Sequence, residues 1–524
     1  MTPAPTDPDA PPPQYVVVIP TLGRPSLQVC LDALASARGP LPRQVVLADD
    51  RRDTPDPLPV RVPAALADRT VTVTLEGRGP AAARNAGWRA AEAAEWVAFL
   101  DDDVRVGPGW RAELMADLTG QPGRVAGVQG RIEVPLPPDR RPTDWERGTA
   151  GLATAHWITA DMAYRRGALI AAGGFDERFP RAFREDADLA LRLLDRGWEL
   201  RCGGRGTTHP VRPASRWVSL KAQAGNADDV LMSRLHGRGW YRRAAAAPGR
   251  RRGHWVTSAL LVSATLAWGA SGATAGPRRA ALRRAALAAG AGWLASTAAF
   301  TAARICPGPR TAEETVTMAV TSALIPPLAV GHWLRGQARY RRVAPWPPAP
   351  AAVLFDRDGT LIRDVPGNGR PELVEPVPGA AEAVARLRAA GVRLGVVTNQ
   401  SAVGRGLISA DQLEAVNRRV DELLGPFGAW AVCPHDEADG CICRKPRPYL
   451  VRQAAAELGL SPADCVVIGD IGSDVAAAYA AGARAVLVPT SVTRSAESDG
   501  VPTAPGLAEA VAAVLGGRAL PCWT

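Results

Sequence analysis

One layout occurs twice along the chain and constrains its fold more than any other feature: a short apolar run ends in aspartates, and a helical stretch follows. WVAFL at 96–100 leads into three consecutive aspartates, and AVLF at 352–355 leads into DRDGT at 356–360. Short apolar runs that alternate with helical stretches predict α/β layer folds. In open α/β sheets, ligands bind at the carboxyl ends of strands, where these aspartates fall. We therefore expect two α/β domains, each with a site where the carboxyl ends of its strands carry aspartates.

The composition changes between these two regions, and the 524 residues suffice for about three domains. The stretch between them is rich in Ala and Arg and poor in strand patterns, and RRVAPWPPAP after it is a stiff, proline-rich linker. The N-terminus is acidic and proline-rich, without the apolar core of a signal peptide. The expected parts are a disordered tail (1–13), an α/β domain (14–215), a helical segment (216–340), the linker (341–350) and a second α/β domain (351–515).

The helical segment contains three uncharged runs, each about long enough to cross a bilayer. The runs are 255–275, 285–303 and 315–334. They are rich in small residues, so a soluble helical subdomain is the alternative to a membrane segment. Arginines at 276–284 and 335–342 favour a hairpin of the second and third runs, with 304–314 on the outer side. We therefore expect membrane association, with both α/β domains at the cytoplasmic, inner face.

Charge and cysteine content limit the possible binding partners and the kind of cellular compartment. The formal net charge is +10, but only Lys221 and Lys445 of the 62 basic residues are lysine, which indicates a coding bias toward arginine. No basic platform interleaved with aromatic residues appears, so we expect no nucleic-acid partner. The eight cysteines do not form a disulfide framework, which favours a reducing compartment with one local metal site.

In the first acidic motif, Asp101 and Asp103 point the same way along an extended segment and can share one target. Their hard oxygen atoms suit Mg²⁺ or Mn²⁺ bound to substrate phosphates, whereas the alternative is a solvated loop. Five motifs around them occur in the order of the family 2 glycosyltransferases, which this region resembles. They are VVIPTLGR (17–24), GPAAARNAGW (79–88), FLDDD (99–103), GGFDERF (173–179) and REDADLALRLLDRGW (184–198).

This resemblance implies a GT-A-like fold, a nucleotide-diphosphate sugar donor and inversion at the anomeric carbon. Asp186 would be the general base for the acceptor hydroxyl, and Asp103 would hold Mg²⁺ or Mn²⁺. His209 is either a further metal ligand or the cap of a loop. A non-catalytic binding or tethering module is the alternative for this region. The residues implied for the nucleotide-sugar are Thr21, Asp49, Arg84, Asp101 and Asp103.

The second acidic motif has the arrangement needed for phosphate-ester hydrolysis. Asp356 and Asp358 lie two residues apart at a strand end, so one carboxylate can attack phosphorus while the other protonates the leaving oxygen. Thr398 ends another strand and can bind phosphoryl oxygens, and Lys445 offers a compact ammonium group that neutralises phosphate. A fourth strand ends at VVIGDIGSD (466–474), whose two aspartates, 470 and 474, can complete a Mg²⁺ site.

This order of motifs resembles the haloacid dehalogenase (HAD) phosphatases, which have a Rossmann-like α/β fold. The resemblance implies a phospho-aspartyl intermediate on Asp356, with Asp358 as acid and base. Mg²⁺ would be held by Asp356, Asp470 and the backbone carbonyl of Asp358. Only 40 residues separate Asp358 from Thr398, which leaves no room for a large cap domain.

A separate metal site is expected in the loop before Lys445. Cys433, His435, Cys441 and Cys443 form two close ligand pairs joined by a short loop, a pattern typical of tetrahedral zinc. Four protein ligands leave no open position, so this zinc would be structural. It would hold the loop that delivers Arg444 and Lys445 to the phosphate pocket.

The zinc pattern together with DRDGT and TNQS resembles D-glycero-D-manno-heptose 1,7-bisphosphate phosphatases, with histidinol phosphatases as near relatives. The expectation is a bifunctional enzyme, with histidinol phosphate or broad sugar-phosphate hydrolysis as the alternative for the second domain. The expected substrates are a sugar phosphate, a nucleotide-sugar and an unidentified acceptor. The residues implied for the sugar phosphate are Asp364, Thr398, Asn399, Gln400, Ser401, Arg405, Arg444 and Lys445.

Overall fold

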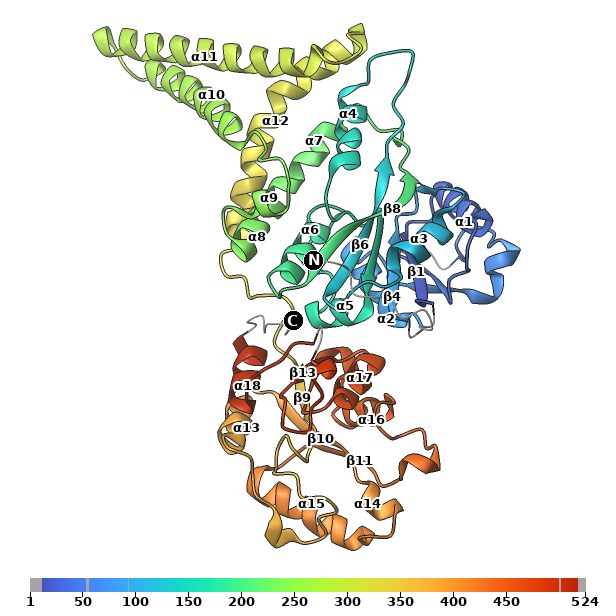
Figure 1. The fold of residues 1–524 in the computed structure, drawn as a ribbon. Coiled ribbons are helices and arrows are strands. Elements are labelled where there is room, and N and C mark those ends of the chain that lie inside the picture. The colour runs from blue at the N-terminus through green and yellow to red at the C-terminus, as the bar shows by residue number, and fades with distance from the viewer. Residues whose placement is uncertain (1–11, 53–55, 93, 499–500, 517–524) are drawn as a thin grey trace.

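The computed structural model describes residues 12–52, 56–92, 94–498 and 501–516. Most of the expected tail, residues 1–11, lies outside this range. Figure 1 shows three bodies along the chain: a mixed α/β domain, a group of helices beside it and a second α/β domain. This arrangement confirms the expected mixed α/β fold class, with two α/β domains and a helical segment between them.

The first domain is built on an eight-stranded sheet in the order β3-β2-β1-β4-β7-β6-β8-β5. β1, β2, β3 and β4 are parallel, and β7 runs antiparallel to both of its neighbours. Helices cover both faces: α1 (Ser26–Ser36), α2 (Pro80–Ala90), α3 (Trp110–Leu118), α5 (Arg166–Ala172) and α6 (Glu185–Leu194). The strands are β1 (Tyr15–Thr21), β2 (Val45–Asp49), β3 (Thr70–Thr74), β4 (Trp96–Leu100), β5 (Arg105–Val106), β6 (Val125–Glu133), β7 (Asp161–Arg165) and β8 (Glu199–Thr208).

Strand β1 shows why the apolar runs are buried on both sides. Its side chains alternate between two cores, with Tyr15, Val17 and Ile19 in one and Val16 and Val18 in the other. A strand with helices on both faces requires a continuous apolar run, which is the pattern that YVVVIP has. Strand β4 is buried in the same way and ends at Leu100, so Asp101 lies at the carboxyl end of the strand.

The second domain has a five-stranded, fully parallel sheet in the order β11-β10-β9-β12-β13. β9 (Ala352–Phe355) is central, so Asp356 follows the middle strand. The other strands are β10 (Arg393–Asn399), β11 (Ala429–Cys433), β12 (Cys465–Gly469) and β13 (Arg484–Leu487). The main helices are α13 (Ala380–Ala389), α15 (Ala410–Leu424), α16 (Tyr449–Glu457), α17 (Gly472–Ala481) and α18 (Leu507–Gly516).

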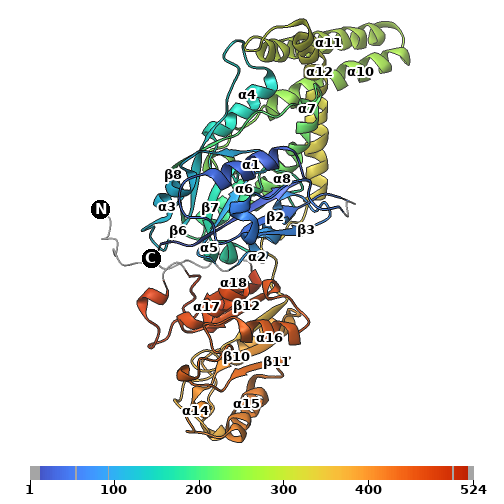
Figure 2. The ribbon, with the colours of Figure 1, turned by 90° about the vertical axis from the view of Figure 1, so that its right-hand side faces the viewer.

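The chain between the two sheets is helical, and its last three helices are long. α10 and α11 form a hairpin that projects away from the first sheet, and α12 runs back to that domain (Figures 1 and 2). α11 and α12 are long and apolar enough to cross a membrane by length and composition. The helices are α7 (Val218–Lys221), α8 (Gly225–His236), α9 (Trp240–Arg243), α10 (Arg251–Gly272), α11 (Gly276–Ile305) and α12 (Ala312–Arg339).

The expected hairpin orientation, with 304–314 on the far side of a membrane, is wrong. The turn between α11 and α12 packs on α4 (Asp144–Ala150) of the first domain, where Arg304 forms a 2.7 Å ion pair with Asp144. The backbone N–H of Asp144 also donates to Glu314 Oε1 at 3.0 Å. The other end of α12 packs on α8, where Gly336 faces Ala227. Both ends of α12 therefore contact the first domain or a helix that packs on it.

Candidate functional sites

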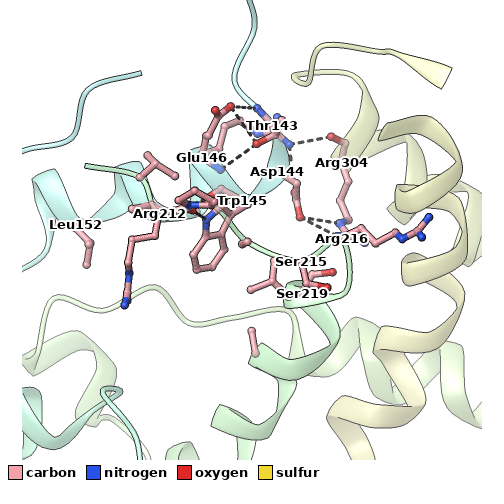
Figure 3. Close-up of a pocket in the computed structure, with 18 of the residues that line it drawn as sticks. Thr143, Asp144, Trp145, Glu146, Leu152, Arg212, Ser215, Arg216, Ser219 and Arg304 are labelled. Carbon is pink, nitrogen blue, oxygen red and sulfur yellow. Dashed lines mark hydrogen bonds and ion pairs between the residues drawn. The ribbon is translucent and has the colours of Figure 1, made fainter. Parts of the chain in front are cut away.

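The acidic edge of the first sheet opens into a cavity of about 1270 Å³. Its lining includes Asp101, Glu185, Asp186 and His209 from the first domain. The remaining walls come from α4, the segment after β8 and helices α10, α11 and α12. Figure 3 shows part of this wall, where Arg304 of α11 reaches Asp144 of α4. The helical segment therefore completes the site that the first sheet begins.

Arg84 of α2 links two carboxylates of this site. It is buried and donates to Asp101 Oδ1 at 2.8 Å and to Glu185 Oε1 at 2.7 Å. A guanidinium group with two partners fixes both carboxylates and offsets its own desolvation. Burial raises the pKa of the Glu185 carboxyl, and the neighbouring Asp186 adds to that shift. Contact of Arg84 with a nucleotide stays a prediction.

Asp103 and His209 meet at the carboxyl end of the sheet, although they are far apart in sequence. Single donor atoms of Asp101, Asp103 and His209 lie within 4.8 Å of one another. Arg212, which the sequence did not single out, forms an ion pair with Asp103, with Nε 2.7 Å from Oδ2. Two carboxylates and an imidazole fit a divalent cation such as Mn²⁺. This placement favours His209 as a metal ligand over the cap of a loop, the two alternatives that the sequence left open.

Asp186 lies in the first turn of α6, where Arg184 precedes the helix in a left-handed conformation (φ 79°). The Asp186 side chain lines the cavity, and its Oδ1 accepts a hydrogen bond from the backbone N–H of Ala187 at 2.7 Å. Burial raises the pKa of this carboxyl above its ordinary value. A carboxylate with a raised pKa is a stronger proton acceptor, which is the property that a general base needs.

Three other acidic residues of this domain have internal partners. Asp102 accepts from Thr21 Oγ1 at 2.8 Å and from Arg24 at 2.9 Å, so Thr21 supports the loop after β4. Both carboxylate oxygens of Asp49 accept from Arg51, and a nucleotide contact through Asp49 stays a prediction. Asp161 is wholly buried and accepts from Trp110, Arg205 and Thr207.

The second site is centred on a buried ammonium group. Lys445 Nζ donates to Asp356 Oδ1 at 2.5 Å, to Asp474 Oδ1 at 2.6 Å and to the Val397 carbonyl at 2.9 Å. Burial raises the pKa of Asp356 well above its ordinary value, and Lys445 opposes that shift. The lysine therefore helps to keep Asp356 ionised, as attack on phosphorus requires.

The carboxylates that could hold a cation here are Asp356, Asp470 and Asp474, whose donor atoms lie within 4.8 Å of one another. Asp474 already uses Oδ1 for Lys445 and Oδ2 for the backbone N–H of Ile471 at 3.2 Å. Asp356 and Asp470 are therefore the carboxylates that fit Mg²⁺. Burial raises the pKa of Asp470 to about 6. Coordination by the Asp358 carbonyl stays a prediction.

The Asp358 carboxylate points to other partners. Its Oδ2 accepts from Gln400 Nε2 at 2.6 Å and from Arg357 Nη2 at 2.9 Å. Gln400 also donates to Thr398 Oγ1 at 2.9 Å, which joins the ends of β9 and β10 into one network. Arg357, a second residue not singled out from the sequence, donates to Asn417 of α15 at 2.7 Å.

Of the remaining residues expected to contact the substrate, Asn399 positions Lys445, whereas the others are exposed or half-buried. Asn399 clamps the backbone of Lys445, because its Nδ2 donates to the Lys445 carbonyl and its Oδ1 accepts the Lys445 N–H at 3.0 Å. It is therefore a positioning residue. Arg405 donates to Ser401 Oγ at 3.0 Å and is exposed, as is Asp364. Arg444 lies beside the His435 carbonyl at 3.4 Å.

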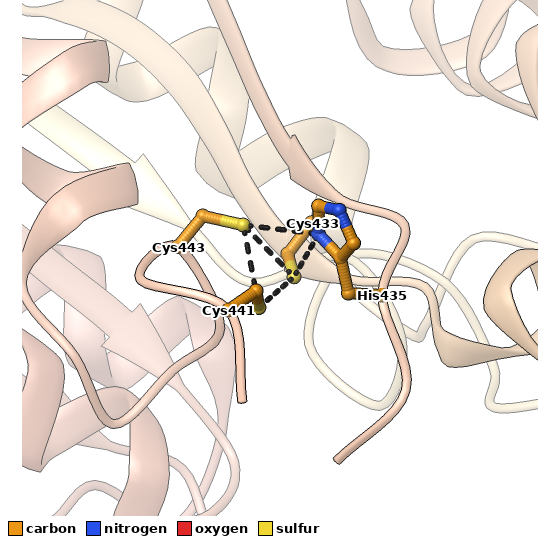
Figure 4. Close-up of side chains that lie close together, drawn as sticks. All are labelled: Cys433, His435, Cys441 and Cys443. Atoms are coloured by element: carbon orange, nitrogen blue, oxygen red, sulfur yellow. Dashed lines mark hydrogen bonds between the residues drawn. The ribbon is translucent and has the colours of Figure 1, made fainter. Parts of the chain in front are cut away.

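The four ligands expected for zinc converge on one point (Figure 4). Cys443 Sγ lies 3.3 Å from Cys433 Sγ, 3.5 Å from Cys441 Sγ and 3.3 Å from His435 Nδ1. Tetrahedral zinc with thiolate bonds of about 2.3 Å needs donors roughly 3.7 Å apart, so the cluster fits such an ion after small adjustments. Cys433 ends β11, which ties the cluster to the sheet.

Known proteins match both halves of the chain. The glycosyl transferase family 2 model matches residues 16–169, and a HAD-hydrolase-like model matches residues 442–513. The chain is therefore an enzyme that joins a family 2 glycosyltransferase domain to a HAD phosphatase domain. A mannosyltransferase from Pyrobaculum calidifontis, solved with GDP-Man and Mn²⁺, is 18% identical over 63% of this chain and 89% of its own, with a TM-score of 0.38.

Curated relatives of the second domain include heptose bisphosphate phosphatases. The Pseudomonas putida D-glycero-beta-D-manno-heptose-1,7-bisphosphate 7-phosphatase is 36% identical over 29% of this chain and 89% of its own length. The Mycobacterium tuberculosis D-glycero-alpha-D-manno-heptose-1,7-bisphosphate 7-phosphatase is 38% identical over 28% of this chain and 82% of its own. The chain belongs, through its C-terminal domain, to this phosphatase family.

Proposed function

We propose that the C-terminal domain removes the 7-phosphate of a D-glycero-D-manno-heptose 1,7-bisphosphate. The observation that carries this proposal is the buried Asp356–Lys445–Asp474 triad at the centre of a domain related to phosphatases of both anomers. Asp356 attacks phosphorus, and the bond from phosphorus to the sugar oxygen breaks. Asp358 donates a proton to that oxygen and then activates water, which releases phosphate from Asp356.

Two metal ions belong to this proposal. Mg²⁺ held by Asp356 and Asp470 would neutralise charge on the transferring phosphoryl group. Zn²⁺ held by Cys433, His435, Cys441 and Cys443 would be structural, because the four side chains complete its coordination. The loop that carries these four ligands would then fix the position from which Lys445 reaches Asp356.

The test is phosphate release by the purified full chain with Mg²⁺. The substrates are the α and β anomers of heptose 1,7-bisphosphate and histidinol phosphate, with Asp356→Asn as the blank. Loss of the 7-phosphate from one anomer, with at least about tenfold higher kcat/KM than for histidinol phosphate, supports the assignment. Equal rates on all three substrates, or a preference for histidinol phosphate, would overturn it.

For the N-terminal domain we propose inverting transfer of a sugar from a nucleotide-diphosphate donor. Asp186 takes the proton of an acceptor hydroxyl as that oxygen bonds to the anomeric carbon and the nucleoside diphosphate leaves. A divalent cation at Asp101, Asp103 and His209 would neutralise the leaving diphosphate. Nucleoside diphosphate release from a panel of UDP-, GDP- and ADP-sugars with Mn²⁺ tests this. Release that survives in Asp103→Ala would contradict the metal assignment.

We also propose that helices α10 to α12 seat the chain on the cytoplasmic face of a membrane without crossing it. Large apolar side chains of these helices face outward, including Leu266 (68% exposed), Trp268 (57%) and Leu294 (61%). The buried side chains of these helices include small or polar ones, such as Thr257, Thr321 and Ser322, beside the apolar Met318 and Ile325 of α12. Outward-facing large apolar side chains are typical of helices in contact with lipid, and the contacts of both ends of α12 with the rest of the chain support an interfacial position.

A further inference from the structure

The cavity at the first site exceeds the usual size of a small-molecule pocket. Small-molecule pockets are about 300–1,000 Å³, whereas this cavity measures about 1270 Å³. It extends from Asp101 and Asp186 at the sheet edge to Phe300 of α11 and to Met318 and Ile325 of α12. The space beyond the catalytic carboxylates is therefore bounded by apolar side chains from the helices that also present large apolar residues outward.

The same cavity holds two arginines without a carboxylate partner. Arg216 and Arg250 line the wall and are exposed, and each lies over an aromatic ring, Trp217 at 5.6 Å and Phe300 at 5.4 Å. Among the residues that the structure describes, no acidic group pairs with either. By contrast, Arg140, Arg147, Arg212 and Arg304 of this wall all have carboxylate partners. Unpaired guanidinium groups are suited to binding a phosphate.

We propose that the acceptor is a membrane lipid whose headgroup carries both a phosphate and the hydroxyl that receives the sugar. This inference rests on the proposed transferase function and names its acceptor class. The headgroup phosphate contacts Arg216 and Arg250, and its hydroxyl reaches Asp186. The hydrocarbon part stays in the lipid layer along α10 to α12, so the acceptor never has to leave the membrane. The transfer step itself has the proton and bond balance given above for Asp186.

The test measures binding, so it does not depend on the identity of the donor. The full chain is floated with vesicles of phosphatidylcholine alone, or of phosphatidylcholine with phosphatidylglycerol, whose headgroup has a phosphate and hydroxyls. We expect binding to the mixed vesicles to be at least about tenfold tighter, a difference that an Arg216→Ala/Arg250→Ala variant removes. Arg278→Ala/Arg279→Ala is the matched control, because it removes the same charge at the exposed start of α11, outside the cavity lining.

Two further experiments separate apolar contact with the lipid layer from binding of the phosphate group. Trp268→Glu/Leu294→Glu places charges on the outward apolar faces, and we expect it to abolish flotation while phosphate release by the second domain is unchanged. Soluble glycerol phosphate offers the same anion without hydrocarbon and should not displace the chain from vesicles. Equal losses in the cavity pair and the control pair would overturn the proposal, as would displacement by glycerol phosphate or no flotation at all. Failure of sugar transfer with intact headgroup-dependent binding would instead contradict the proposed transferase function.

Discussion

At the residue scale, Lys445 is the side chain on which the second site depends most. It is one of two lysines in the chain, and it is 4% exposed between two carboxylates. Removal of the ammonium group would leave Asp356 and Asp474 close together in a buried place without a counter-charge. Loss of one partner from a buried ion pair costs far more than the pair contributes, because the desolvated charges stay behind.

We therefore expect Lys445→Met to lower the free energy of unfolding of the second domain by about 3–5 kcal/mol and to abolish phosphate release. The double variant Lys445→Met/Asp474→Asn should recover part of that stability but none of the activity. Urea unfolding and phosphate release measure the two effects. A single variant as stable as the parent protein would show that the pair is not buried as described.

The raised pKa of Asp186 gives a pH dependence for the first site. A general base must be ionised, so sugar transfer should fall as the pH drops through the pKa of this carboxyl. Because burial raises that pKa, the acid limb should have its midpoint above the ordinary aspartate value of 3.8. The pH profile of nucleoside diphosphate release measures it. Asp186→Asn should lower transfer by about 10²–10⁴-fold, and an unchanged acid limb in that variant would contradict the role.

At the scale of elements, the loop with the proposed zinc ligands (Cys433 to Cys443) is coupled through the backbone to Lys445. Cys443 precedes Lys445 by two residues, and Asn399 at the end of β10 clamps the Lys445 backbone from the other side. Two independent anchors thus hold a segment without regular secondary structure. Metal binding contributes directly to the stability of such a loop, because its ligands have no fixed positions in the unfolded chain.

Cys443→Ser should therefore abolish zinc binding, destabilise the second domain by at least about 2 kcal/mol and reduce phosphate release. Zinc content by mass spectrometry, thermal unfolding and phosphate release are the measurements. Cys202→Ser is the matched control, because Cys202 is an exposed free cysteine of the first domain. Equal zinc content in the two variants would exclude the cluster as the metal site.

At the scale of the whole molecule, the site of the second domain lies on the side that faces away from the first domain. The first domain contacts the segment around Ala351, Asp464 and Arg484, which are the amino ends of β9, β12 and β13. All strands of that sheet are parallel, so Asp356 and Asp470 lie at the opposite edge. Trp346 of the linker also donates to the Gly173 carbonyl at 3.1 Å. The domains therefore pack closely without a shared site.

This arrangement predicts that the two activities are independent. Asp356→Asn should leave the rate of sugar transfer within about twofold of the parent, and Asp186→Asn should do the same for phosphate release, because distant sites without shared partners behave additively. The full chain with both assays run on each variant provides the measurement. A loss of one activity on removal of the other site would indicate coupling that the packing does not explain.

Much of the fold follows from local patterns in the sequence. The apolar runs before Asp101, Asp356 and Asp470 are strands because burial on both faces demands continuous hydrophobicity. The sequence did not predict β3, β5, β6, β7 or β8. β8 contains three glycines and two arginines, which obscure its alternation, and β3 is a largely exposed edge strand. Such strands exist because a neighbouring strand pairs with them, and pairing is not a local property.

Local sequence was enough to predict the two acidic strand ends, the proposed zinc ligands and the lysine of the second site, since each needs particular side chains at short spacing. The meeting of groups far apart in the chain depended on the fold. The fold brought His209 and Arg212 to Asp103, engaged Asp474 with Lys445, and docked the turn after α11 on Asp144. Chain spacing fixes neighbours within an element, whereas contacts between elements depend on how sheets and helices pack.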